Sequence, residues 1–525
     1  MNLSTPVWLY RRGATLKYKI KEYADIKETV ARMELEDLLR CVVCPNIDLE
    51  NPDVKPENTL AMMFHTTTKE KAKNTVDEII RENGNMKLFA ADLEFGAGRA
   101  VKGLTRFPSF MACGIVDDED IAYRMGEVCA AEAKEVGYSW AFAPCVDIIM
   151  NHDNPIVSTR GIGEDADKVI KIGGAYMRGM QDNGIIATLK HFPGDGICDK
   201  DQHLTTPENS LSFGDWDKSY GRVYRALIEQ GVKAIMPGHI SLPAYDVKDE
   251  KLGIYPPATL SKRLLTDLLK NTLGFAGIII SDAVNMGGFC GFMNYYDACC
   301  TFLEAGGDCL LFAHMTERFI NEMKSAVKDG RLHMHTLKNR AYRMLCFARE
   351  FSETIVNQKP DTDGQILSDL IVERACKVVL NRNNTIPFNI KQNSRILHLM
   401  IQNNYASEDV TRLTNELRKY SGFVDELTDP GPDVLREIAE NNKYDLIICT
   451  VGCQVAYGIN TVRLHGTLAR NMMMGWTKFD IPVVFVNYGN PWVFEEYGAV
   501  MDSVINTYGC TEHTAAVVVN KILGK

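Results

Sequence analysis

The sequence contains no apolar run long enough to cross a bilayer, which takes about 18 uninterrupted apolar residues. Residues 1–20 also lack a hydrophobic stretch of signal-peptide length, and their charges follow the apolar residues instead of preceding them. Basic residues are not in excess, because 58 Lys and Arg against 68 Asp and Glu give a formal charge of −10. Nucleic-acid-binding domains and polybasic membrane anchors are electropositive. We therefore expect a cytoplasmic protein with no membrane partner and no nucleic-acid partner.

Paired cysteine motifs are scarce as well, although the chain has 15 cysteines. Cys41 and Cys44 form one CxxC, but no second pair stands at zinc-ribbon spacing. Many other cysteines lie inside apolar segments, which is typical of reduced cysteines used as small core residues. The glycines of residues 161–174 do not follow a strand as a nucleotide-binding loop would. We expect no metal and no cofactor.

At 525 residues the chain exceeds what one hydrophobic core usually supports, so two domains are expected. In the first part, short apolar runs typical of strands alternate with amphipathic stretches of helical length. The runs lie at 88–93, 141–149, 185–191, 233–237, 277–281 and 308–312, and the helical stretches at 117–136, 165–182, 216–230 and 261–272. This alternation predicts parallel βα units.

Polar side chains follow these apolar runs one after another. They are Asp92 and Glu94, several residues of 147–160 and 190–203, His239, and Asp282. Functional residues after successive strands are typical of the C-terminal face of a (β/α)8 barrel, whereas an open doubly wound sheet gathers its site at one switch point. The predicted fold class is α/β, with a (β/α)8 TIM-like barrel.

A smaller α/β sandwich domain is expected after the barrel. Residues 26–39 are helical in pattern, the segment through Pro45, Pro52 and Pro56 is loop-like, and residues 315–385 favour helices. Apolar runs typical of strands then follow at 395–401, 444–451, 481–487 and 503–507. We place a linker near residues 352–362. The predicted domains are a catalytic barrel with an N-terminal extension, 1–352, and a sandwich, 363–525.

The stretch from residue 185 to residue 207 is the densest in reactive side chains. After the apolar run come Lys190 and His191, a Gly-Asp-Gly turn, and then Asp199, Asp201 and His203. Polar groups are costly to bury unpaired, and reactive side chains tend to lie on loops held by a rigid scaffold. We therefore expect the chemistry to be located here.

Two further segments accompany this stretch. Residues 147–165 end in RGIGED, and GFAGIIISDAV places Asp282 at the end of an apolar run, although an Asp there is as often a helix N-cap. With the KHF of residues 190–192, these motifs make the sequence resemble glycoside hydrolase family 3. Within the family it resembles the two-domain β-N-acetylhexosaminidase branch, because Asp201-Gln202-His203 matches the Asp-x-His dyad of that branch.

The resemblance implies a retaining, exo-acting β-glycosidase that acts on short oligosaccharides or glycosides. Such an enzyme needs a carboxylate nucleophile on one side of the anomeric carbon and a proton donor at the leaving oxygen. By resemblance, Asp282 is the nucleophile that forms the glycosyl-enzyme, His203 is the acid/base, and Asp201 fixes the tautomer of His203. An unperturbed imidazole titrates near neutrality and suits this role.

The same resemblance implies a set of residues that hold the hydroxyls of the sugar before the cleaved bond. They are Asp92, Arg160, Lys190 and His191. Arg99 and His239 are secondary candidates, since each could be an ordinary residue of the barrel rim. Asp147 could simply orient the neighbouring loop.

Other interpretations of these residues stay open. His203 could be a surface-loop histidine, and Asp199 and Asp201 could be turn formers. A metal site from Asp195, Asp199, Asp201 and His203 lacks the spacing of a known metal loop. The sequence departs from the branch at LEFGAGR (93–99), where QEGGR is usual, and at Asp195, where His is common. These changes leave the reaction type alone and put the exact sugar in question.

The favoured function is a β-N-acetylglucosaminidase, and a β-glucosidase of the same family is an alternative. A β-N-acetylglucosaminide phosphorylase is another, because an imidazole is neutral after giving up its proton, whereas a deprotonated Glu would repel phosphate. A catalytically silent sugar-binding protein, the alternative from another class, predicts that Asp282→Ala changes nothing. The second domain could pack against the barrel, help form a homodimer, or reach toward the site.

Overall fold

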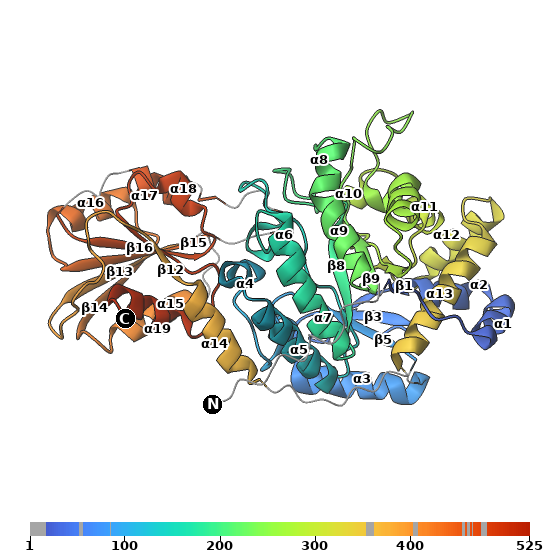
Figure 1. The fold of residues 1–525 in the computed structure, drawn as a ribbon, viewed down its shortest axis with the longest axis horizontal. Helices are drawn as coiled ribbons and strands as arrows, with labels where there is room; N and C mark the ends of the chain where they lie inside the picture. The colour runs from blue at the N-terminus through green and yellow to red at the C-terminus, as the bar shows by residue number, and fades with distance from the viewer. Residues whose placement is uncertain are drawn as a thin grey trace.

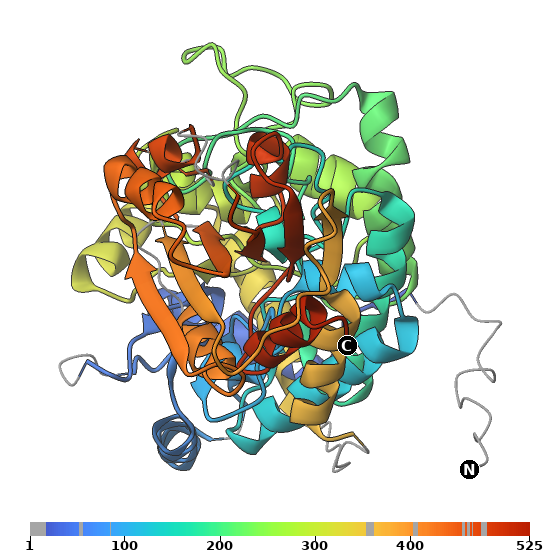
Figure 2. The same cartoon turned by 90° about the vertical axis from the view of Figure 1, so that its left-hand side faces the viewer.

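The computed structural model describes residues 17–51, 56–84, 86–352, 362–402, 408–453, 457–458, 463–464, 466–473 and 480–525. These residues form a barrel and a second, sheet-centred domain that lies at one end of it (Figure 1). Figure 2 looks onto the second domain, with the barrel behind it. The expected linker near 352–362 falls almost entirely outside the described residues, so the boundaries 1–352 and 363–525 stay a prediction.

The strands of the first domain are parallel and close into a ring. In spatial order they are β1 (Val43–Cys44) with β2 (Asn46–Ile47), β3 (Ala61–Phe64), β5 (Leu88–Ala91), β7 (Trp140–Ala141), β8 (Ile186–Phe192), β9 (Ala234–Pro237), β10 (Ile278–Ile279) and β11 (Leu310–Leu311). A bridge between Ile280 and Cys309 joins β10 to β11, and β11 pairs with β1. With β1 and β2 taken as one position, this confirms the predicted (β/α)8 barrel.

Helices surround this ring and return the chain from one strand to the next (Figure 1). They are α1 (Ala24–Arg32), α2 (Leu35–Val42), α3 (Lys69–Asn83), α4 (Phe110–Val116), α5 (Glu119–Glu135), α6 (Ala166–Lys168), η4 (Val169–Gly173), α7 (Gly174–Asp182), α8 (Phe213–Lys218), α9 (Tyr220–Glu229), η6 (Arg263–Thr272), α10 (Gly287–Cys290), α11 (Tyr295–Ala305), α12 (Glu317–Lys328) and α13 (Met334–Ser352). Local chemistry sets their starts. For example, Asp118 caps α5 by accepting hydrogen bonds from the backbone N–H groups of Asp120 and Ile121.

The second domain is built on a mixed sheet with helices on both faces. Its strands, in spatial order, are β12 (Lys377–Asn381), β17 (Ser503–Asn506), β16 (Val483–Gly489), β15 (Leu446–Cys453), β13 (Arg395–Gln402) and β14 (Phe423–Thr428). One face is covered by α14 (Gly364–Ala375), α15 (Glu408–Leu417) and α19 (Thr514–Ile522), and the other by α16 (Pro432–Glu440), α17 (Gly466–Met473) and α18 (Val493–Tyr497). The central strands are mostly apolar and almost completely buried because both faces are covered. The predicted α/β sandwich is confirmed.

Two local predictions are wrong. The segment around Pro45 forms β1 and β2 of the barrel, because the missing N–H of Pro45 is tolerated between two short strands while its carbonyl accepts from the backbone N–H of Met63. The predicted helix through residue 385 ends at Ala375, and Lys377–Asn381 forms β12, antiparallel to β17. The run Val378-Val379-Leu380 pairs with the sheet, and this tertiary contact overrides the helical pattern.

Helix α14 joins the two domains. Its Leu367 and Ile371 pack into the core of the barrel, and Val372 packs into the core of the second domain. Nearby, the hydroxyl of Ser109 donates to the carbonyl of Tyr508 at 2.5 Å. Apolar packing and hydrogen bonds therefore hold the second domain against the barrel. Among the described helices, none is both long and apolar enough to span a membrane.

A buried carboxylate, Asp308, pairs with arginines at the amino-terminal end of β11. Asp308, which precedes β11, accepts from Nε of Arg343 on α13 at 2.8 Å and from the backbone N–H of Ile279 at 2.9 Å. Burial raises the pKa of Asp308, but the charges of Arg343, Lys270 and Arg340 lower it further, to about 2. The cluster ties the last helix of the domain to two barrel strands.

Asp308→Asn is expected to lower the free energy of unfolding by about 3–5 kcal/mol at pH 7, because the partly buried guanidinium groups of Arg343 and Arg340 lose their counter-charge. Since the folded pKa lies below the ordinary value of 3.8, the stabilisation by Asp308 is complete above about pH 4 and is lost as the pH falls toward 2. Urea unfolding should therefore show the two proteins converging below about pH 4. The control Asp329→Asn, at an exposed ion pair, should cost about 1 kcal/mol or less. Equal stability of Asp308→Asn and the wild type at pH 7 would contradict the role of the cluster.

Candidate active site

The predicted site residues converge at the carboxyl ends of the barrel strands. Asp92 follows β5, Lys190 and His191 lie near the carboxyl end of β8, His239 follows β9 and Asp282 follows β10. The carboxyl ends of parallel barrel strands meet on one face, where loops can present side chains to a ligand. The structure therefore brings most of the predicted residues together.

A buried ion cluster forms one wall of this face. Glu94 accepts two hydrogen bonds from Arg160, at 2.6 and 3.0 Å, and lies 2.7 Å from Nζ of Lys190. The same Nζ is 2.9 Å from Asp92, whose side chain is 49% exposed while that of Lys190 is 4% exposed. Burial raises the pKa of Glu94, but Arg160 and Lys190 lower it far more, so Glu94 is a carboxylate. The ion cluster therefore pairs two cations with two carboxylates and leaves Asp92 as the member that reaches solvent.

Two side chains, Asp147 and His191, link the next strands to Asp282. The backbone N–H and Nδ1 of His191 both donate to Asp147, the ring at 2.7 Å. This leaves Nε2 of His191 directed at Asp282, with a distance of 3.9 Å to Oδ2. Burial raises the pKa of Asp147, but His191 and backbone N–H groups lower it further, so Asp147 stays ionised. Asp147 therefore orients the imidazole that faces Asp282, as well as the neighbouring loop.

Asp282 is held as a carboxylate that still reaches solvent. Its side chain is 13% exposed, and Oδ1 accepts from the backbone N–H of Ala283 at 2.8 Å. Burial raises the pKa of Asp282, but the fields of His191, His239 and His203 together with the Ala283 hydrogen bond lower it below its ordinary value. An ionised, partly exposed carboxylate of this kind can act as a nucleophile.

His203 and Asp201 form a hydrogen-bonded dyad on the loop after β8. Oδ1 of Asp201 accepts from the backbone N–H of His203 and lies 2.7 Å from Nδ1 of the ring. Burial raises the pKa of Asp201, but the hydrogen bonds of His203 and of the Gly458 backbone lower it further. Since an ionised carboxylate only accepts, Nδ1 carries the proton and Nε2 of His203 is left for chemistry.

The dyad loop is attached to the segment that follows Asp282. The backbone N–H of Gly287 donates to the carbonyl of His203 at 2.7 Å, and that of Gly288 donates to the carbonyl of Gln202 at 3.1 Å. Gln202 also accepts, through its side-chain oxygen, from the backbone N–H of His239 at 2.9 Å. The loops after β8, β9 and β10 are thus tied to one another on the same face.

His239 lies behind Asp282 and is fully buried. Its Nε2 is 3.0 Å from the carbonyl of Ala283, and its Nδ1 is 3.0 Å from the hydroxyl of Thr259. Burial lowers the pKa of His239, so the ring is neutral and donates from Nε2 to Ala283. His239 is therefore placed to hold the backbone next to Asp282, at Ala283, and not to contact a ligand.

The candidate Arg99 and the loop residue Asp199 lie outside this network of contacts. Arg99, in the short helix η2 (Ala97–Arg99), has an exposed side chain that makes no hydrogen bond or ion pair with the part of the chain that the structure describes. Asp199 is also exposed. The structure therefore neither assigns Arg99 a partner nor joins Asp199 to the dyad.

The conceivable metal set of Asp195, Asp199, Asp201 and His203 does not gather into one cluster. Within the described ranges, the donor atoms that lie within 4.8 Å of one another belong to Cys145, Asp147 and His191. All three already hydrogen-bond one another through Asp147. Asp195 is instead a buried loop residue that accepts from Asn154 at 2.7 Å, and burial next to Asp147 raises its pKa to about 6.

The second domain contributes two residues that sequence reasoning missed. The backbone N–H of Gly458 donates to Oδ2 of Asp201 at 2.6 Å, and the ring of Tyr457 stacks on His203 with 4.7 Å between the ring centroids. Glu94 was also missed as a site residue, although its position two residues after Asp92 at a strand end is a weak signal. For Tyr457 and Gly458 no local pattern exists, because their partners are some 250 residues earlier.

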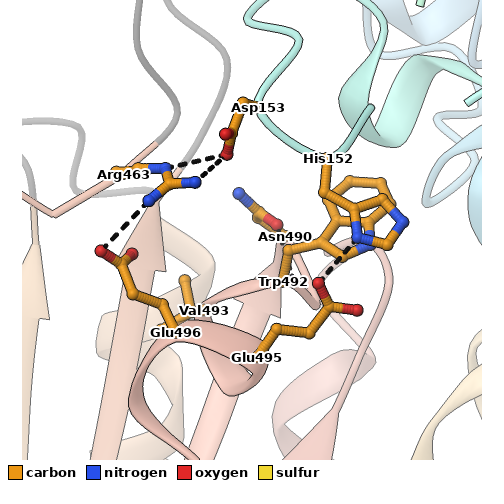
Figure 3. Close-up of a pocket in the computed structure, with 8 residues that line it drawn as sticks. All are labelled: His152, Asp153, Arg463, Asn490, Trp492, Val493, Glu495 and Glu496. Atoms are coloured by element: carbon orange, nitrogen blue, oxygen red, sulfur yellow. Dashed lines mark hydrogen bonds and ion pairs between the residues drawn. The ribbon is translucent and has the colours of Figure 1, made fainter. Parts of the chain in front are cut away.

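A pocket of about 220 Å³ lies between the domains, and none of the predicted site residues lines it (Figure 3). His152 of the barrel stacks on Trp492 at 4.6 Å, and its Nδ1 is 2.7 Å from Glu495. Arg463 pairs with Asp153 of the barrel and also with Glu496. These contacts hold the second domain on the loop that follows β7.

Comparisons with known proteins identify the family of the chain. A family model described as the N-terminal domain of glycosyl hydrolase family 3 matches residues 21–347. The chain is 28% identical to a β-N-acetylglucosaminidase/β-glucosidase of Cellulomonas fimi, over 95% of this chain and 93% of that protein. It is also 28% identical to a β-hexosaminidase of Neisseria meningitidis serogroup C, over 50% of this chain and 70% of the relative.

A solved structure supports the two-domain arrangement. The β-glucoside phosphorylase BglX bound to 2FGlc matches with a TM-score of 0.86 and 25% identity, over 97% of this chain and 96% of that one. The resemblance inferred from the motifs is confirmed, because the family model alone spans more than half of the sequence. The chain belongs to glycosyl hydrolase family 3.

Proposed function

We propose that the protein is a retaining, exo-acting β-N-acetylglucosaminidase. The observation that carries this proposal is the pairing of two groups on one face of the barrel. They are an ionised, partly exposed Asp282 and a His203–Asp201 dyad whose loop is hydrogen-bonded to the segment after Asp282. A nucleophilic carboxylate and a separate proton donor are the two groups that retaining glycoside cleavage requires.

In the first step, a carboxylate oxygen of Asp282 attacks the anomeric carbon while the glycosidic C–O bond breaks. Nε2 of His203 gives its proton to the leaving oxygen. Asp201 holds Nδ1–H and stabilises the imidazolium before the transfer. The products of this step are a glycosyl ester on Asp282, the free aglycone alcohol and a neutral His203.

In the second step, Nε2 of the neutral His203 removes a proton from water as the water oxygen attacks the anomeric carbon. The ester bond to Asp282 breaks, the carboxylate is restored and His203 is protonated again. His191, oriented by Asp147, faces the restored carboxylate at 3.9 Å.

The residues proposed to bind the sugar hydroxyls before the cleaved bond belong to the ion cluster of Asp92, Glu94, Arg160 and Lys190. Asp92 is the most exposed member and is the one that contacts the sugar. Lys190 holds Asp92 in place, and Arg160 holds Glu94. His191 lies between this cluster and Asp282. His239 acts through Ala283, and Arg99 stays a secondary candidate at the rim. Fixed hydrogen-bond partners of this kind favour the reactive geometry of the bound sugar.

The identity of the sugar is supported by the relatives. The similarity to a β-N-acetylglucosaminidase/β-glucosidase and to a β-hexosaminidase favours N-acetylglucosamine, with glucose as the alternative. The choice of acceptor, water or phosphate, depends on the acid/base residue. A neutral imidazole does not repel an anion, and the similarity to a β-glucoside phosphorylase favours phosphate as a second acceptor.

Product analysis on aryl β-glycosides tests both the sugar and the acceptor. We expect turnover of the N-acetylglucosaminide to exceed that of the glucoside and the xyloside, with free sugar released in phosphate-free buffer. If phosphate accelerates turnover and yields a sugar 1-phosphate, the protein is a β-N-acetylglucosaminide phosphorylase instead. A preference for the glucoside in both buffers would replace the sugar assignment by β-glucosidase.

A further inference from the structure

The acid/base dyad lies on a loop without regular secondary structure, so its geometry depends on contacts made from outside the loop. Residues 195–206 contain turns and bends but no helix and no strand. The backbone of the loop is held by Gly287 and Gly288, as described above. Those hydrogen bonds do not determine the rotation of the Asp201 carboxylate or the tilt of the His203 ring. The second domain contacts both of these groups.

The Asp201 carboxylate is held from two sides. Oδ1 accepts both the backbone N–H and Nδ1–H of His203, and Oδ2 accepts the backbone N–H of Gly458 at 2.6 Å. The carboxylate is completely buried, so a weakened hydrogen bond at Oδ2 would be costly. Gly458 has φ +80°, a left-handed conformation that favours glycine, and this conformation directs its N–H at Asp201.

The His203 ring is held on one face. The centroid of Tyr457 lies 4.7 Å from that of His203 with 30° between the planes, within the range of a favourable stacked pair. The guanidinium of Arg160 lies 5.8 Å from the Tyr457 ring, so Tyr457 lies between the dyad and the ion cluster that contains Arg160. The Tyr457 side chain is 52% exposed and makes no large contribution to a core.

We propose that Tyr457 and Gly458 are positioning residues for the acid/base, so that the second domain completes the active site of the barrel. Gly458 sets the rotation of the Asp201 carboxylate, and Tyr457 keeps Nε2 of His203 aimed at the leaving oxygen. The inference rests on the proposed acid/base role of His203. It gives the second domain a part in proton transfer in addition to packing.

The test compares Tyr457→Leu with His203→Ala and with the double variant, on aryl glycosides of graded leaving-group ability. Tyr457→Leu is expected to lower kcat roughly 10- to 100-fold for poor leaving groups, because misplacement of a catalytic group by about 1 Å has this cost. Activated aryl glycosides should lose little. In the His203→Ala background the same substitution should have no further effect, since Tyr457 acts through His203. Tyr457→Phe, which keeps the ring, should recover most of the lost rate.

The control is Tyr444→Leu. Tyr444 belongs to the same domain, precedes β15 at the opposite end from Tyr457, and hydrogen-bonds Asp425. Melting temperatures of all variants report folding separately from rate. An equal loss in both backgrounds, or a raised KM with unchanged leaving-group dependence, would overturn the inference and make Tyr457 a binding residue.

The proposed function and this inference fail in different ways. If His203→Ala itself shows no leaving-group dependence, the acid/base assignment is wrong and the inference falls with it. If His203→Ala shows the dependence and Tyr457→Leu does not, the inference alone is overturned.

Discussion

Asp282→Asn is expected to reduce kcat by about 10⁴-fold or more on every glycoside substrate, because the amide cannot form the glycosyl ester. The amide oxygen can still accept from the Ala283 N–H, so the fold and the binding of the sugar should be retained. The fall in rate then reports the lost nucleophile and no structural change. Steady-state kinetics on an activated aryl glycoside, with the melting temperature as a folding check, measures it.

A fluorinated N-acetylglucosaminide that traps the glycosyl-enzyme should label Asp282, and peptide mass spectrometry locates the label. The matched control is Asp199→Asn, the same chemical change at an exposed position of the dyad loop, which should alter the rate by less than about twofold. Labelling of Asp92 or Asp147, or an active Asp282→Asn, would remove the nucleophile assignment. An Asp282→Ala variant unchanged in every property would support the silent sugar-binding alternative.

The pH dependence of the wild type gives a further check on Asp282. Because its pKa is held below the ordinary value for Asp, the carboxylate stays ionised through the neutral range. Any loss of kcat/KM caused by protonation of Asp282 should therefore appear only below about pH 4.

His203→Ala is expected to have the second largest effect, and the size of the effect should depend on the leaving group. For sugar or alkyl leaving groups, kcat should fall by about 10²- to 10⁴-fold, the usual contribution of general acid catalysis. For a dinitrophenyl leaving group, which departs without a proton, the first step should slow by less than about tenfold. Pre-steady-state bursts separate this step from the second.

Asp201→Asn should follow the same leaving-group pattern, because the amide no longer fixes the proton on Nδ1 of His203. The control His335→Ala removes an exposed imidazole on α13 and should leave kinetics unchanged. If an activated aryl glycoside suffers as much as a poor substrate in His203→Ala, the proton-donor role is wrong.

Much of the site was predictable because the barrel presents reactive residues at strand ends in chain order. Lys190 and His191 follow an apolar run that is short enough for a buried strand, and Asp282 follows another. Which of these residues meets a ligand was not predictable. His239 occupies an equivalent position after its strand but is fully buried. Lys190 forms ion pairs with Asp92 and Glu94. Burial and pairing depend on neighbours from other strands, which a local pattern does not contain.

The errors in the fold have the same origin. The segment Lys377–Asn381 follows a helix and carries no strong turn signal, so its pattern favours more helix. It becomes a strand because β17 offers an antiparallel partner more than a hundred residues later. Similarly, Pro45 disfavours a strand locally, but the closing barrel pairs the residues on both sides of it.

By itself, the sequence determined the alternation of strands and helices, the barrel, and the chain order of the carboxylates, cations and imidazoles, because hydrophobic periodicity and strand ends are local properties. Only the tertiary structure decided that Glu94 pairs with Arg160 and Lys190. It also decided that Gly458 and Tyr457 of the second domain contact the Asp201–His203 dyad. Those contacts join residues far apart in the chain. They exist because the second domain packs against the barrel and brings Tyr457 and Gly458 onto the face that carries the dyad.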